Sequence, residues 1–290
     1  MGRSIRARGV SGLLRIRPKS SMEKRNLELS KIAKNGEKVS TPSKRLKTRY
    51  VDSFGGRIFY ANESSESNIS IIYIHGGSYY ADFTSFHWSF LKKIIRKTNA
   101  KIIAPAYRLV PFGTYKEAFD FIVLLYKDYI KKHPNDKIIL MGDSAGGGLA
   151  LAIAIYMKMN EIFLLDELVL ISPWVDVGLH NPEIKKYVDK DPFLNVEALR
   201  ASVKPWLGTL DEKNWQVSPL YGDLSGLHNV TIFVGTREIF YPDIIKLYQK
   251  LDVDGNNELI IGKDMNHAYP IIPIPESREA LRIISRIIKR

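Results

Sequence analysis

The 290-residue chain contains no cysteine. This absence excludes disulfides, thiolate metal sites and cysteine nucleophiles together, and it fits a reducing compartment, so a cytoplasmic location is expected. The chain also lacks an apolar run long enough to cross a bilayer. The uncharged stretch 144–157 has 14 residues, whereas a membrane-spanning helix needs roughly 20.

Acidic residues are scarce at one end of the chain. The net charge is +12, and residues 1–50 hold 15 lysines and arginines against three glutamates, so the remainder is balanced. The basic excess is therefore a property of that end and not of the fold. We expect a solvated N-terminal segment packed over the body, and no nucleic-acid partner. Contact of residues 1–20 with an anionic membrane stays open as an alternative, as does a homo-oligomer.

Short apolar runs rich in β-branched residues alternate with longer helical patterns along most of the chain. Strands that are apolar throughout and separated by helices predict an α/β fold, with a mostly parallel sheet covered on both faces. The runs lie at 70–77, 101–107, 137–143, 167–173, 230–236 and 257–267, and the helices at 85–97, 115–132, 145–159, 243–251 and 276–290.

Two regions depart from this alternation. Residues 21–35 predict an additional helix that Ser21 caps and Gly36 ends, in a basic segment spanning 1–45. Residues 180–216 contain no strand pattern, and an insertion there would follow a strand's carboxyl end, where such folds bind ligands. We therefore expect one α/β domain over 46–290 whose 180–216 insertion forms a lid together with the N-terminal segment. A β-hairpin is predicted around two adjacent glycines at 55–56.

The glycine-rich stretch GDSAGGG at 142–148 offers either a phosphate cradle or an exposed serine. No lysine follows the glycines as a Walker loop requires, and the order of glycines does not match a dinucleotide fingerprint. The stretch does match G-x-S-x-G between a strand and a helix, a strained turn that exposes the hydroxyl of Ser144. The sequence therefore predicts a serine nucleophile, with no cofactor and no metal.

A serine hydroxyl needs a base, and that base needs an acid to orient it. In this arrangement the acid and then the histidine follow the serine along the chain. His267 lies in a turn-like context after a late strand, whereas His180 and His228 do not, so His267 is the predicted base. Glu238 follows the strand run 230–236 and is the preferred acid. Asp243 remains the alternative.

The developing oxyanion needs backbone donors close to the serine. Gly76 and Gly77 end the strand run 70–77, and Ala145 follows the nucleophile. The N–H groups of these three residues are the predicted oxyanion hole. Glycine suits the first two positions because the acyl group must approach the backbone closely.

These motifs together resemble the hormone-sensitive-lipase-like esterases of the α/β-hydrolase superfamily. The shared stretches are HGG at 75–77, YRLVP at 107–111, GDSAGG at 142–147, SPWVD at 172–176 and NHAYP at 266–270. Two positions differ from the usual pattern of the family. Ser78 replaces the third glycine of HGGG, and Glu238 stands where the acid is usually aspartate.

The resemblance implies a serine carboxylesterase that hydrolyses short-chain acyl esters under a lid. Carried over to this sequence, it gives Ser144 as nucleophile and His267 as base. It also gives supporting roles to His75, which orients the oxyanion loop, and to Asp143. A non-catalytic small-molecule-binding protein on the same scaffold remains the alternative, since such relatives keep the pocket and lose a member of the triad.

Overall fold

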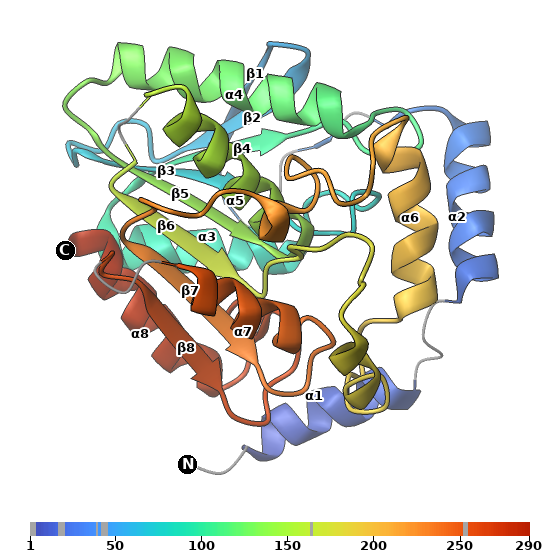
Figure 1. Cartoon of the computed structure of the whole chain (residues 1–290). Coiled ribbons are helices and arrows are strands. Elements are labelled where there is room, and N and C mark those ends of the chain that lie inside the picture. Colours follow the sequence, from blue (N-terminus) through green and yellow to red (C-terminus); the bar gives the residue numbers. More distant parts are fainter. Residues whose placement is uncertain (1–3, 17–20, 39, 42–45, 163–164, 252–254) are drawn as a thin grey trace.

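One eight-stranded sheet organises the computed structural model, which describes residues 4–16, 21–38, 40–41, 46–162, 165–251 and 255–290 (Figure 1). The strand order is β1-β2-β4-β3-β5-β6-β7-β8. The hairpin of β1 and β2 joins β4 antiparallel, and every later pairing is parallel. The strands are β1 Arg49–Ser53, β2 Gly56–Ala61, β3 Ile69–Ile74, β4 Lys101–Ala106, β5 Lys137–Asp143, β6 Glu167–Ile171, β7 Val230–Gly235 and β8 Glu258–Gly262. The predicted α/β class, the hairpin and the parallel sheet are confirmed.

Helices cover both faces of the sheet, as its apolar strands require. On one face α3 (Ser85–Thr98) and α8 (Glu276–Lys289) share a buried apolar cluster with the strands. On the other, α4 (Tyr115–Lys132), α5 (Ser144–Met159) and α7 (Tyr241–Lys250) pack in a second cluster. Helix α7 begins two residues before the predicted start because Pro242 fits the first turn of a helix.

The basic N-terminal segment contains two helices. Helix α2 (Met22–Asn35) matches the prediction: the Ser21 hydroxyl accepts from the Lys24 N–H at 3.2 Å, and Gly36 follows the helix. Helix α1 (Ile5–Ile16) was not predicted. It is held to α8 by Ser4, whose N–H and hydroxyl donate to the Glu276 carboxylate at 2.6 and 2.9 Å. Parts of the 1–20 stretch and of the 37–45 connection lie outside the described residues.

The 180–216 segment contains helix α6 (Val196–Leu207) and the 3₁₀ turn η1 (Pro182–Lys186), with no strand among its residues. Helix α2 lies beside α6 at one side of the molecule (Figure 1), and the Arg25 guanidinium donates to the Ser202 hydroxyl at 2.7 Å. Helix α2 of the N-terminal segment therefore packs against helix α6 of this segment. Two further 3₁₀ turns are η2 (Pro219–Tyr221) and η3 (Tyr269–Ile271).

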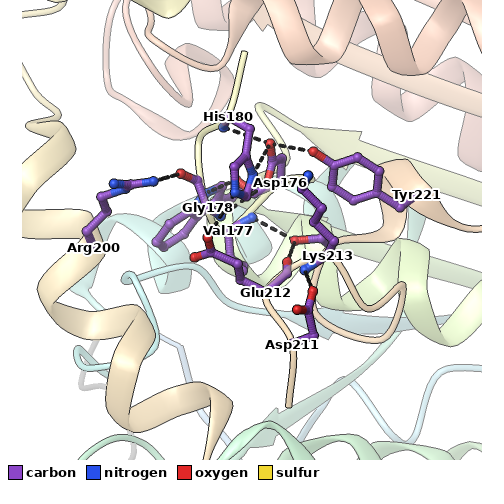
Figure 2. Close-up of polar contacts among 11 residues, drawn as sticks. Asp176, Val177, Gly178, His180, Arg200, Asp211, Glu212, Lys213 and Tyr221 are labelled. Carbon is purple, nitrogen blue, oxygen red and sulfur yellow. Dashed lines mark hydrogen bonds and ion pairs between the residues drawn. The ribbon is translucent and has the colours of Figure 1, made fainter. Parts of the chain in front are cut away.

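A polar cluster joins the two ends of the 180–216 segment (Figure 2). Nδ1 of His180 lies 3.0 Å from the buried carboxylate of Asp176, and Nε2 lies 2.9 Å from Glu212. Burial lowers the pKa of His180, but the hydrogen bonds and charges of the two carboxylates outweigh it and raise that pKa above its usual value. The Tyr221 hydroxyl also donates to Asp176, at 3.1 Å.

The same cluster fixes helix α6. The Arg200 guanidinium donates to the Gly178 carbonyl at 2.6 and 3.1 Å (Figure 2). The start of the segment, its end and its helix are thus bound to one site next to β6.

None of the described helices is long and apolar enough to cross a membrane.

We predict that His180→Gln destabilises the fold below neutral pH and has little effect in alkali. The pKa of His180 is raised in the folded state, so the stabilisation is complete below the unfolded value of about 6.5 and is lost as pH rises through the folded value. Because the imidazole is partly exposed, we expect a loss of about 1 kcal/mol or less in unfolding free energy. Denaturant unfolding at about pH 6 and about pH 9 measures it.

The matched control is His228→Gln, since His228 is exposed. That variant should unfold like the wild type at both pH values. A loss in His180→Gln that is equal at the two pH values would contradict the role of the imidazolium.

Candidate active site

Ser144 occupies the sharp turn between β5 and α5. Its φ of +51° lies in the left-handed region, which a residue with a side chain rarely adopts. The turn also needs small neighbours, because a Cβ on Gly146 would lie 2.2 Å from the Ile74 carbonyl oxygen, and one on Gly142 would lie 2.4 Å from the Gly146 oxygen. The strained strand–turn–helix predicted from G-x-S-x-G is therefore present.

Three side chains from three separate loops meet at this turn. Nε2 of His267, from the loop after β8, lies 2.9 Å from the Ser144 hydroxyl oxygen. Nδ1 of the same ring lies 2.6 Å from a carboxylate oxygen of Glu238, which follows β7. All three are buried: the exposed fractions are 6% for Ser144, 3% for His267 and 0% for Glu238. The arrangement forms a continuous hydroxyl–imidazole–carboxylate chain.

The second carboxylate oxygen of Glu238 is also hydrogen-bonded. It accepts from the Ser172 hydroxyl at 2.8 Å and from the Gly235 N–H at 2.6 Å. The Ser172 oxygen in turn accepts from the N–H of Ala268, the residue after the histidine, at 2.9 Å. Ser172 thus connects the acid loop to the histidine loop. It falls in the SPWVD stretch, but sequence reasoning gave it no role.

The electrostatics of the site raise the pKa of the imidazole. Burial lowers the pKa of His267, but the hydrogen bond and charge of Glu238, with smaller contributions from Asp191 and Asp143, raise it above its usual value. Because Glu238 binds Nδ1, Nε2 is the nitrogen that faces the serine. This is the geometry in which a histidine can take a proton from the hydroxyl.

Asp243, the alternative acid, lies elsewhere. It sits in the first turn of α7, where it is buried, and burial raises its pKa to about 6. The carboxylate bonded to His267 is that of Glu238. Within the described ranges, no group of three or more histidine and acidic side chains is arranged to hold a metal ion.

The oxyanion loop after β3 corrects one prediction. The N–H of Gly76 donates to the Asp143 carboxylate at 3.0 Å, so it is not a free donor. The N–H groups of the next two residues, Gly77 and Ser78, donate no hydrogen bond to any described residue. The N–H of Ala145 lies in the first turn of α5, where helical N–H groups have no partner in the helix. Gly77, Ser78 and Ala145 are therefore the available set.

The Asp143 side chain is hydrogen-bonded to this loop. Its buried carboxylate accepts from Tyr73 Oη at 2.6 Å as well as from Gly76, and it lies 3.4 Å from Nε2 of His87. Burial acts to raise the pKa of Asp143, but the charge and hydrogen bond of His87, with the Tyr73 and Gly76 donors, hold it below its usual value. Sequence reasoning named Asp143 and missed His87, which lies 56 positions away along the chain.

His75 holds the other side of the loop. Its Nδ1 lies 2.6 Å from the Gly76 carbonyl oxygen, and its ring stacks on Tyr107 with centroids 4.5 Å apart. The Tyr107 hydroxyl donates back to the His75 carbonyl at 2.8 Å. Tyr107 belongs to the YRLVP stretch, so this motif and HGG meet in space.

Side chains from the helices outside the sheet also contact this loop. The Tyr79 ring stacks 4.1 Å from Trp206 of α6 and 5.5 Å from Trp174. The guanidinium of Arg25, from α2, lies 3.6 Å from the centroid of the Tyr80 ring. Helices α2 and α6 therefore contact the two residues that directly follow Gly77 and Ser78.

The chain is similar in sequence and fold to several known proteins. A family model for the α/β-hydrolase fold matches residues 71–271. An esterase of Acinetobacter venetianus is 31% identical over 221 residues, which cover 74% of this chain and 73% of the relative. The crystal structure of the hormone-sensitive-lipase homologue EstE7 from a metagenome library is 26% identical, with a TM-score of 0.83 over 98% of this chain and 97% of that one. A hormone-sensitive lipase from a metagenome library gives 26% and 0.82 over 98% of each chain. The chain therefore belongs to the α/β-hydrolase family, in the branch of hormone-sensitive-lipase-like esterases and lipases that its sequence resembles.

Proposed function

We propose that this chain is a serine carboxylesterase that hydrolyses short-chain acyl esters through an acyl-enzyme. The observation that carries the proposal is the unbroken contact from the Ser144 hydroxyl through His267 to Glu238, at 2.9 and 2.6 Å. A nucleophile, a base and an acid in this order are the parts that acyl transfer needs.

In the first half of the reaction, Ser144 Oγ attacks the ester carbonyl carbon while His267 Nε2 takes the hydroxyl proton. The oxyanion accepts hydrogen bonds from the N–H groups of Gly77, Ser78 and Ala145, and Glu238 stabilises the imidazolium. The imidazolium then gives its proton to the alcohol oxygen as the C–O bond breaks. In the second half, water attacks the acyl-serine, and His267 takes its proton and returns it to Ser144.

The substrate class follows from what surrounds the histidine. The Phe240 ring lies edge-on to His267 with centroids 5.2 Å apart, and the Phe193 ring lies 6.0 Å away. With Ser144 only 6% exposed, these rings favour a small acyl group over a long chain. We further propose that the 180–216 segment and the segment 1–45 act as a lid, because α6 and α2 contact the oxyanion loop.

A binding protein on the same scaffold is the second candidate. It would keep the pocket and lack a working nucleophile, base or acid. Nothing at Ser144, His267 or Glu238 favours that alternative, since each side chain meets the next at hydrogen-bond distance.

We predict that hydrolysis of p-nitrophenyl acetate requires Ser144. Ser144→Ala should lose about 10⁵- to 10⁶-fold in kcat, as removal of a triad serine does. An organophosphate should add one phosphoryl group to the wild type and none to this variant, as read by intact mass. Equal labelling of both proteins, or turnover that survives Ser144→Ala, would reject the proposal.

We predict that activity falls as the acyl chain lengthens from acetyl to decanoyl. The physical reason is that Ser144 is only 6% exposed and Phe240 is buried, so that a longer chain has to displace packed side chains there. The measurement is kcat/KM across p-nitrophenyl esters below their solubility limits. A maximum at the decanoyl ester would contradict the short-chain assignment.

We predict that kcat/KM rises with pH through the raised pKa of His267, because only the neutral imidazole accepts the serine proton. Glu238→Gln removes the carboxylate that raises this pKa, so the acid limb should move to lower pH while kcat falls about 10³- to 10⁴-fold. Asp243→Asn is the control, and its acid limb should stay in place. If Asp243→Asn moves the limb and Glu238→Gln does not, Asp243 is the acid.

A further inference from the structure

A short stretch of the 180–216 segment lies against the loops that carry the acid and the histidine. The Lys190 carbonyl accepts from the Arg237 guanidinium at 3.2 Å, on the residue before Glu238. Two residues beyond Asp191, the Phe193 ring approaches that of His267, with centroids 6.0 Å apart. This stretch therefore contacts both loops of the site.

Asp191 makes the most specific of these contacts. Its side chain is 0% exposed. One carboxylate oxygen accepts from the N–H groups of Phe193 and Leu194 at 2.7 and 3.0 Å, which fixes its own loop. The other accepts from the N–H of Ile239, the residue after Glu238, at 3.0 Å. One buried carboxylate thus bonds the insertion to the acid loop.

We propose that Asp191 is a positioning residue that holds the acid loop where Glu238 meets His267, so that the 180–216 segment completes the triad as well as covering it. The inference rests on the proposed function. Glu238 bonds His267 through one carboxylate oxygen. The 180–216 segment binds the residues on either side of Glu238, Arg237 and Ile239, and the backbone position of Glu238 depends on both.

The charge of Asp191 acts in the same direction as its hydrogen bonds. The charged groups facing His267 are Glu238 from the loop after β7, Asp143 from the end of β5, and Asp191 from the insertion. Burial raises the pKa of Asp191. The charge of His267 and the three backbone N–H groups that donate to Asp191 act in the opposite direction and favour the ionised carboxylate. His87 lies against Asp143, and the Arg237 guanidinium donates to the Lys190 carbonyl. Loss of the Asp191 charge should therefore lower the pKa of His267.

The test uses Asp191→Asn, which removes the charge and leaves one acceptor oxygen in place of two, so the side chain can no longer accept from both its own loop and the Ile239 N–H. We expect kcat for a short p-nitrophenyl ester to fall about 10- to 100-fold with KM changed little, because the triad is displaced and the binding surface is not. We also expect the acid limb of kcat/KM to move to lower pH. Asp189→Asn is the matched control, since Asp189 is exposed two residues away in the same stretch.

A second measurement separates positioning from simple destabilisation. If Asp191 acts through Glu238, its substitution should matter much less in a Glu238→Gln background than in the wild type. An effect that is equally large in both backgrounds would overturn the inference. So would an unchanged acid limb with only a lower melting temperature, or a control variant that behaves like Asp191→Asn.

The experiments distinguish failure of this inference from failure of the proposed function. Loss of turnover in Ser144→Ala, with Asp191→Asn like the wild type in kcat and in pH profile, would reject the role of Asp191 alone. Turnover that survives Ser144→Ala would reject the esterase mechanism, whatever Asp191→Asn does.

Discussion

The whole site depends on one buried charge. Glu238 has no exposed surface, and an isolated carboxylate in such a place is strongly disfavoured unless hydrogen bonds satisfy it. Its oxygens are satisfied by the Ser172 hydroxyl, the Gly235 N–H and Nδ1 of His267. Folding of the acid loop, orientation of the imidazole and the connection to the end of β6 are therefore coupled, because the loss of any donor leaves a buried carboxylate with fewer hydrogen bonds.

The oxyanion loop obeys a similar rule on the other side of the serine. The Asp143 carboxylate accepts from the Gly76 N–H, and this fixes the backbone so that the following N–H groups are the ones without a partner among the residues that the structure describes. The left-handed φ of Ser78, +52°, continues that path. Serine occupies the place of the usual third glycine there at a modest conformational cost, since the donor needed is the backbone and not the side chain.

The features that could be predicted from the sequence are those that neighbouring residues determine. The strand–helix alternation, the hairpin, the Ser21 cap and the turn at Ser144 all depend on neighbours in the chain, and all are present. It could not decide which glycine keeps a free N–H, because Asp143 competes for Gly76 from 67 residues away. Ser172 and Asp191 were missed for the same reason. Their roles arise only when loops from different strands meet, and a lone serine or aspartate gives no signal of that.

The N-terminal helices raise a question of timing during synthesis. Ser4 bonds Glu276 across 272 positions, and Arg25 bonds Ser202 across 177. Each of these residues thus waits for a partner translated much later, and contacts of such separation are entropically slow to form. Ser202 exists well before α8 is made, so α2 can dock on α6 and reach the oxyanion loop early, whereas Ser4 can bind Glu276 only once α8 has been synthesised.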